Sequence, residues 1–186
     1  MEETGIPNPS SETMSNIIIS SELREQVRQA REAYLQLANL GTESKNQVLH
    51  AFAKALRANT SKILEANALD VVEAEKMVQS GELSESACKR VMLNEAKIEL
   101  MAQNCESVAK LEDPVGQVLQ ATRLDEGLDL YRVSCPIGVV LVIFESRPDV
   151  VVQISVLAVK SGNAVILKGG REAVHSNRVL AEILRS

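Results

Sequence analysis

Aromatic side chains are scarce in this sequence: among 186 residues there are two Phe, two Tyr and no Trp. A core must therefore be built from Val, Ile, Leu and Ala, because 45% of the residues are still hydrophobic, an ordinary share for a soluble globular protein. No apolar run reaches the ~18 residues of a membrane-spanning helix, and the acidic N-terminal segment lacks the basic and apolar regions of a signal peptide. These absences predict a cytoplasmic protein with no membrane partner.

Clusters of basic residues and paired cysteines are also missing. The net charge is −5 and the Lys and Arg residues are dispersed, so we expect no nucleic-acid partner. Cys88, Cys105 and Cys135 are an odd number without CxxC spacing. This pattern indicates reduced thiols of a cytosolic protein rather than a disulfide framework or a zinc site. No metal site is expected.

The familiar nucleotide-binding loops do not occur. The sequence contains neither GxxxxGK[ST] nor GxGxxG, so a P-loop is excluded and the common dinucleotide fingerprint does not apply. His50 and His175 stand alone in helical patterns, where we expect them to be solvated. Cys135 precedes a proline and is expected to be a buried or edge thiol rather than a nucleophile. No Ser/His/Asp or Cys/His catalytic arrangement is therefore indicated.

Helical periodicity dominates the first part of the chain. Residues 1–18, rich in Pro, Ser and Thr, are expected to be a flexible lead-in. Residues 19–111 then follow the spacing of amphipathic helices. We predict helix N-caps at Ser44, which has a Gln three residues later in capping-box spacing, at Ser84 and at Asn94.

A β-hairpin is predicted over residues 117–134. Two segments of alternating polarity, 118–124 and 128–133, flank Asp125-Glu126-Gly127, which supplies a turn with glycine. The hairpin separates the helical region from a segment of different periodicity.

Residues 137–186 have the pattern of a βαβα unit. The continuous apolar runs 139–144 and 164–168 are typical of parallel strands covered on both faces. The β-branched segment between Pro148 and Gly162 fits a helix or a strand by periodicity. Its length, the proline before it and the glycine after it favour a helix. Glu172 to Leu184 is predicted as the second helix. Two strands do not complete a doubly wound α/β sheet, so we expect the chain to be a fragment.

Charged residues and glycines follow both predicted strands. They lie in FESRPD, Phe144 to Asp149, and in KGGRE, Lys168 to Glu172. Ligands of open α/β sheets bind beyond the carboxyl ends of the strands, and helix N-termini there favour anions. From the residues alone, the glycine pair fits a tight turn as well as a ligand site, and Arg147 is more often a surface or capping arginine. Residue patterns therefore extend only to an α/β domain with a candidate site for a phosphorylated ligand.

Several segments resemble the γ-glutamyl phosphate reductase (glutamate-5-semialdehyde dehydrogenase) family, a branch of the aldehyde dehydrogenase superfamily. The combination of VIFESRPD, LKGG and SN is a specific signature, and the resemblance runs from about residue 22 to the last residue. It is carried by residues 93–102, 112–119, 128–139 and 136–177. The implied fold is the first part of an aldehyde-dehydrogenase-type, Rossmann-like NADP-binding domain, preceded by the helical region and the hairpin.

The resemblance implies an activity in proline biosynthesis. Members of the family reduce γ-glutamyl phosphate with NADPH to glutamate 5-semialdehyde and phosphate, through a thioester on a cysteine thiolate. That cysteine is expected beyond residue 186, in a catalytic domain absent from this chain, so we expect the chain alone to be inactive. The alternative is a non-catalytic, truncated paralogue that only binds nucleotide or joins an oligomer.

The resemblance also implies binding residues at the two strand ends. Lys168 aligns with the cofactor lysine of the superfamily. Arg171 stands where many NAD-using relatives have a glutamate, and an arginine pairs with a 2′-phosphate, which favours NADP(H) over NAD. Ser146 and Arg147 are expected to bind the acyl phosphate. The implied cofactor-binding residues are Phe144, Glu145, Lys168, Gly169, Gly170 and Arg171.

Further partners follow from the resemblance. Hairpins of this superfamily commonly form oligomerisation flaps, so a homo-oligomer is expected when the protein is full length; an ordinary hairpin packed on its own domain is the alternative. Association with glutamate kinase is also implied, since some members are fused to that enzyme. Here Met1 and the lead-in argue against a fusion. An unpaired sheet edge predicts aggregation or marginal stability of the chain alone.

Overall fold

Helices make up the N-terminal part of the computed structural model, which describes residues 20–186. The lead-in predicted for residues 1–18 lies outside the described residues. The predicted helical region is confirmed: it consists of α2 (Ser21–Leu37), α3 (Thr42–Ala58), α4 (Thr60–Gln79), α5 (Glu85–Val91) and α6 (Glu95–Ala109).

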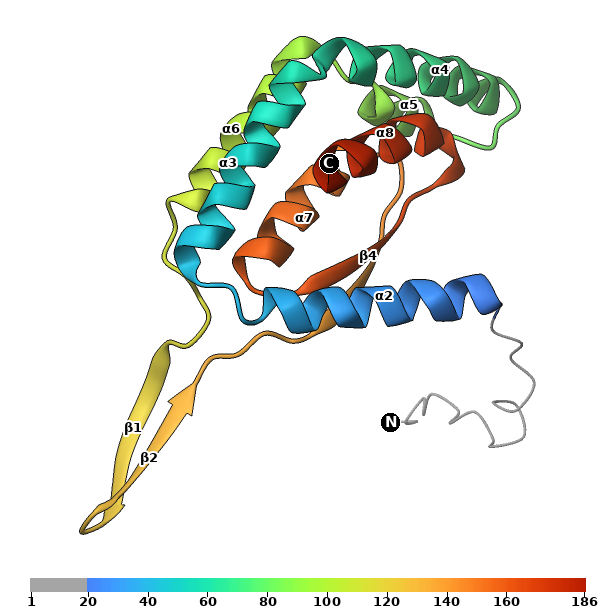
Figure 1. Cartoon of the computed structure of the whole chain (residues 1–186). Coiled ribbons are helices and arrows are strands. Elements are labelled where there is room, and N and C mark those ends of the chain that lie inside the picture. Colours follow the sequence, from blue (N-terminus) through green and yellow to red (C-terminus); the bar gives the residue numbers. More distant parts are fainter. Residues whose placement is uncertain (1–19) are drawn as a thin grey trace, which may run out of the picture.

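 Helix α6 packs side by side with α3 (Figure 1).

Side-chain caps start two of these helices as predicted. The Ser84 hydroxyl accepts a hydrogen bond from the Ala87 amide at 3.2 Å, and the Asn94 side chain accepts one from the Lys97 amide at 2.9 Å. The cap predicted at Ser44 is wrong. Helix α3 begins two residues earlier, after Gly41, and has no side-chain cap.

An aliphatic core joins the helical region to the C-terminal segment. Its buried members are Leu, Ile, Val, Ala, Met and Cys side chains from α3, α4, α6, α7 (Asp149–Lys160) and α8 (Val174–Arg185). Phe52 and Phe144 only border this core. The composition thus builds the interior that the shortage of aromatic residues requires.

The C-terminal segment forms the predicted βαβα unit. Strand β3 (Val139–Ile143) pairs in parallel with β4 (Ala164–Lys168), and α7 connects them. Helix α7 ends at Lys160, and Gly162 just beyond it has a φ of +70°, which suits glycine. The Gly162 amide donates to Val159 O, and the Asn163 amide to Ala158 O, which completes a Schellman motif.

Two details of this unit differ from the sequence-based expectation. Strand β3 is not covered on both faces, because its Leu141 and Ile143 side chains are 59% and 64% exposed. These side chains are two residues apart and share one face of the strand, which is uncovered in the described chain. Helix α8 starts at Val174 rather than Glu172, since Arg171–Ala173 form a 3-10 turn.

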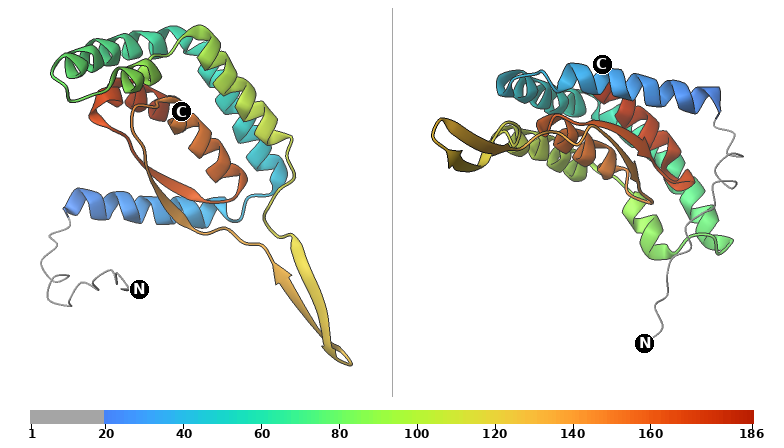
Figure 2. Two further views of the ribbon diagram at one scale, coloured as in Figure 1. Left: turned by 180° about the vertical axis from the view of Figure 1, so that it is seen from behind. Right: turned by 90° about the horizontal axis from the view of Figure 1, so that it is seen from below.

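The hairpin projects away from the rest of the molecule in every view (Figures 1 and 2). Strands β1 (Val118–Asp125) and β2 (Leu128–Val133) are antiparallel, and Gly127 in the turn has a φ of +77°. Nearly every residue of both strands is exposed. The hairpin therefore does not pack on its own domain, which was the alternative to an oligomerisation flap.

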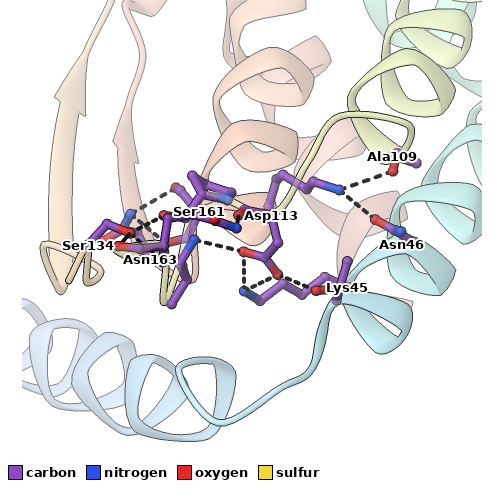
Figure 3. A network of polar contacts seen from close by, with 12 residues as sticks. Lys45, Asn46, Ala109, Asp113, Ser134, Ser161 and Asn163 are labelled. Atoms are coloured by element: carbon purple, nitrogen blue, oxygen red, sulfur yellow. Dashed lines mark hydrogen bonds and ion pairs between the residues drawn. The ribbon is translucent and has the colours of Figure 1, made fainter. Parts of the chain in front are cut away.

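Buried polar contacts hold the base of the hairpin (Figure 3). The Lys45 ammonium contacts both carboxylate oxygens of Asp113 at 3.0 and 3.2 Å, and the Thr42 hydroxyl donates to Asp113 Oδ2. Nearby, the buried Lys160 ammonium donates to Asn46 Oδ1 and Ala109 O. Polar groups of α3 thus hold Asp113 in the segment that leads into the hairpin, while Lys160 of α7 connects α3 to the end of α6.

The pKa of Asp113 reflects this setting. Burial by itself raises the pKa, but hydrogen bonds from the Val115 amide, Lys45 and Thr42, together with the Lys45 charge, lower it more. The net pKa lies below the ordinary value of aspartate, so the carboxylate stays ionised at neutral pH.

Candidate functional site

The carboxyl ends of β3 and β4 bring the two charged loops together. Ile143 and Lys168 are the last paired residues of the strands, and the Phe144 amide donates to Lys168 O at 3.1 Å. We call residues 144–148 the first edge loop and residues 169–173 the second edge loop. All the binding residues predicted from the sequence lie on these loops or at the end of β4.

A buried carboxylate that the sequence reasoning missed connects the two loops. Glu172, in the second edge loop, accepts hydrogen bonds from the amide and the hydroxyl of Ser146 in the first; the hydroxyl bond is 3.1 Å long. Both residues are buried, at 6% and 3% exposure. The only signal in the sequence was an acidic residue shortly after a glycine pair, and acidic residues ordinarily lie on the surface.

The two glycines of the second edge loop provide space for side chains. Neither Gly169 nor Gly170 has a positive φ, so a tight turn does not explain them. A Cβ on Gly170 would collide with the Glu172 carboxylate, and one on Gly169 would collide with the Asn177 amide and lie 3.3 Å from Phe144 Cζ. The sequence suggested that a ligand approaches the backbone at the two glycines. In the structure, side chains of the protein itself, chiefly Glu172 and Asn177, occupy that space.

The basic side chains of the site reach solvent. Lys168 is exposed, and Arg171 is 87% exposed with only a 3.7 Å ion pair to Glu82. Arg147 is half exposed and donates to Asp149 Oδ2 at 3.0 Å. Glu145 is also exposed. Lys168, Arg147 and Arg171 remain accessible to a ligand, because the ion pairs of the two arginines are exposed and screened by solvent.

The N-terminus of α8 is already occupied by a carboxylate of the protein. Asp70 of α4, which is fully buried, accepts hydrogen bonds from the His175 and Ser176 amides at 3.0 and 2.7 Å. Such amides are the groups that would otherwise bind an anion. The His175 and Ser176 amides are therefore already paired with Asp70 and are not available to an anion.

The cysteines do not contribute to the edge loops. Cys88 and Cys105 are buried, and burial raises the pKa of the Cys105 thiol to about 11. For Cys135 the sequence left a buried or an edge position open; it is exposed and follows β2 at the base of the hairpin. His50 and His175 are exposed, as predicted.

The part of the chain that the structure describes contains neither a candidate metal cluster nor a helix that could span a membrane. Residues 20–186 hold no group of three His, Cys, Asp or Glu residues suited to a metal ion. Within the same range, every helix is too short or too polar to cross a bilayer.

The fold and the sequence together define the class of protein. Residues 14–186 match the aldehyde dehydrogenase family, and the chain belongs to that family. More particularly, it is similar to γ-glutamyl phosphate reductases. The enzyme of Haloquadratum walsbyi is 52% identical over 156 residues, which cover 84% of this chain and 34% of that relative. The chain thus spans about a third of the length of this relative.

Solved structures of γ-glutamyl phosphate reductases have the same fold. The Saccharomyces cerevisiae enzyme superposes with a TM-score of 0.82 at 44% identity, covering 89% of this chain and 41% of that one. The Thermotoga maritima enzyme gives a TM-score of 0.81 at 40% identity, covering 89% and 39%. The arrangement of helical region, hairpin and βαβα unit is therefore that of this branch of the family.

Proposed function

We propose that the intact protein containing this chain reduces γ-glutamyl phosphate to glutamate 5-semialdehyde and phosphate, with NADPH, in proline biosynthesis. The observation that carries the proposal is the identity of 40–52% to γ-glutamyl phosphate reductases over most of this chain. Three free cysteines fit a reducing compartment, so we place the reaction in the cytoplasm.

The cofactor would bind across the second edge loop. Lys168 at the end of β4 and Arg171, three residues later, are exposed cations, and a guanidinium matches the geometry of a 2′-phosphate. Redirecting Arg171 from Glu82 costs little because that ion pair is long and solvated. Glu172, the residue after Arg171, accepts both hydrogen bonds of Ser146 through Oε1 and is not free to accept ribose hydroxyls through the same oxygen.

The acyl phosphate would bind at the first edge loop. Arg147 uses Nη2 for Asp149 and has further guanidinium donors for a phosphate oxygen. Ser146 lies next to it with its hydroxyl directed at Glu172. This chain would thus bind and orient the two reactants, while NADPH supplies the hydride.

The nucleophilic cysteine would come from sequence beyond this chain. Cys88 and Cys105 are buried in the helical region, and Cys135 lies outside the edge loops. A thioester-forming thiolate must instead reach the ligand from another part of the intact protein.

The hairpin would join subunits of a homo-oligomer. Its strands expose Leu119, Leu124, Leu128, Leu130 and Tyr131, which is more apolar surface than a solvated hairpin needs. Its anchored base, with the buried Lys45–Asp113 pair, would present that surface in a fixed direction (Figure 3).

The reverse reaction of the intact protein tests the proposed function. We expect glutamate 5-semialdehyde to be oxidised with reduction of NADP+ only when phosphate is present, since phosphate is the second substrate in that direction. Intact mass establishes first whether the purified protein continues past Ser186. Binding of NADPH without phosphate-dependent turnover, in a protein that ends at Ser186, would instead support the non-catalytic alternative.

A further inference from the structure

The first edge loop contains an unusual backbone conformation. Ser146 has a φ of +54°, and no other non-glycine residue in the range 20–186 has a positive φ. The left-handed region is unfavourable for a residue with a Cβ, so it persists only where surrounding contacts hold it. Ser146 is also almost completely buried.

Glu172 provides the contacts that hold this conformation. Both donors of Ser146, its amide and its hydroxyl, point to the same carboxylate oxygen, Glu172 Oε1. Hydrogen bonds to an ionised acceptor are stronger than neutral ones. Glu172 forms no ion pair with a basic residue of the described chain, so the two Ser146 donors are its main compensation for burial.

The position of Glu172 is itself fixed from two directions. Gly170 leaves the space that the carboxylate fills, since any Cβ there would collide with it. Asp70 binds the amides of His175 and Ser176, so the start of α8, two residues after Glu172, is tied to α4. A continuous set of contacts thus leads from α4 to the first edge loop.

We propose that Glu172 is a positioning residue, which holds Ser146 in the left-handed conformation and so directs Arg147 toward the bound acyl phosphate. It acts through Ser146 and does not itself touch the substrate. The identity of the substrate rests on the proposed function, whereas the fixed geometry of the loop does not.

Substitution by glycine at residue 146 separates this role from a general structural one. Glycine adopts a φ near +54° without the penalty of a Cβ, so Ser146→Gly needs less help from the carboxylate. If Glu172 only supported the start of α8, glycine at position 146 would not compensate for its loss. The double variant Glu172→Ala/Ser146→Gly therefore identifies the positioning role.

Hydrogen exchange of the intact protein tests the geometry independently of activity. In Glu172→Ala we expect the peptide covering residues 144–149 to exchange about tenfold faster, because the Ser146 amide loses its acceptor. Peptides of α3 and α6 should be unchanged. Glu182→Ala, which removes an exposed carboxylate from α8, is the matched control and should leave residues 144–149 as in the wild type. Unchanged exchange in Glu172→Ala would overturn the proposal.

Kinetics with the acyl phosphate test the consequence. We expect kcat/KM to fall about tenfold or more in Glu172→Ala, since small misplacement of a binding group is costly. The double variant should regain a clear part of this loss, and the KM for NADPH should stay constant. A double variant no better than Glu172→Ala, or an unchanged kcat/KM, would overturn the positioning role. If the wild type has no such activity, the proposed function fails and the exchange experiment still decides the geometry.

A milder variant covers the case in which Glu172→Ala does not fold. Glu172→Gln keeps a carbonyl acceptor in the same place but removes the charge. We expect exchange at residues 144–149 between that of the wild type and that of a loop without an acceptor, and a smaller loss of kcat/KM. Wild-type exchange and wild-type kcat/KM in Glu172→Gln, when Glu172→Ala is unfolded, would count against the proposal.

Discussion

The Lys45 ammonium lies 3.0 Å from the Asp113 carboxylate, with the two side chains only 2% and 11% exposed. The pair connects the first turn of α3 to the segment that enters the hairpin, 68 residues further along the chain. A buried pair of this kind contributes little net stability by itself, but removal of one partner leaves an uncompensated charge.

Asp113→Ala should therefore destabilise the protein strongly. We expect a loss of about 3–5 kcal/mol in the free energy of unfolding, because Lys45 stays buried without its counter-ion. Urea unfolding followed by circular dichroism measures it. The exposed hairpin pair Arg123–Asp129 provides the control, and Asp129→Ala should cost about 1 kcal/mol or less. Equal losses in the two variants would mean that the Lys45–Asp113 pair is effectively solvated.

Acid should weaken the same anchor. The pKa of Asp113 is lower in the folded protein than its ordinary value of 3.8, so its contribution to stability is complete above that value and is lost as the pH falls through the folded-state pKa. We expect the stability of the wild type to fall more steeply below about pH 4 than that of Asp113→Asn. Urea unfolding midpoints of both proteins, measured on either side of pH 4, test this. Parallel dependence of the two midpoints on pH would contradict the prediction.

Arg171 should determine the preference for the phosphorylated cofactor. We expect Arg171→Glu to weaken NADPH binding about tenfold or more through loss of a charge-assisted contact, and to leave NADH binding nearly unchanged. Titration of the intact protein with each cofactor measures both affinities. Arg178→Glu, an exposed charge reversal on α8, is the control. Equal changes for NADPH and NADH would show that Arg171 does not contact a 2′-phosphate.

Arg147 should act on the substrate rather than on the cofactor. Loss of a hydrogen bond to a charged group is worth about 1.5–3 kcal/mol, so Arg147→Ala should lower kcat/KM for the acyl phosphate about 10–100-fold. The affinity for NADPH should be retained. Arg185→Ala, at the exposed end of α8, serves for comparison. An unchanged kcat/KM in Arg147→Ala would leave Arg147 as a residue that only fixes the turn through Asp149.

The hairpin should control assembly. Leu128 and Leu130 are two residues apart on β2, so they share a face, and both are exposed. Replacing both with Lys should shift the intact protein to a smaller species in sedimentation velocity, while the circular dichroism spectrum stays that of the folded protein. Glu126→Lys in the exposed turn is a control for added charge. An unchanged sedimentation coefficient would place the subunit contact elsewhere.

Local signals in the sequence were sufficient for most elements of the fold. Ser84 and Asn94 cap their helices through bonds to residues three positions away, and Gly162 ends α7 within one turn. Gly127 sets the hairpin in the same way, through its own backbone conformation. Such interactions can be predicted from the sequence because the residues that form them are close together along the chain.

The candidate site depends on contacts that have no local signal. Ser146 and Glu172 are 26 residues apart, and Asp70 lies more than 100 residues before the amides that it binds. The glycine pair suggested a turn or a ligand, but its space is filled by Glu172 and Asn177. The parallel pairing of β3 with β4 brings Ser146 and Glu172 together, and the packing of α4 on α8 brings Asp70 to its amides. A single sequence does not state which distant polar residues meet.

Because aromatic residues are so few, the intrinsic fluorescence of the chain is expected to be weak. Its tyrosines, Tyr34 and Tyr131, lie outside the buried core, and there is no tryptophan to compete with an introduced one. Tyr131 is exposed on the projecting hairpin. A Tyr131→Trp substitution would therefore give this chain a single tryptophan, whose emission spectrum changes when the hairpin passes from water to the surface of another subunit.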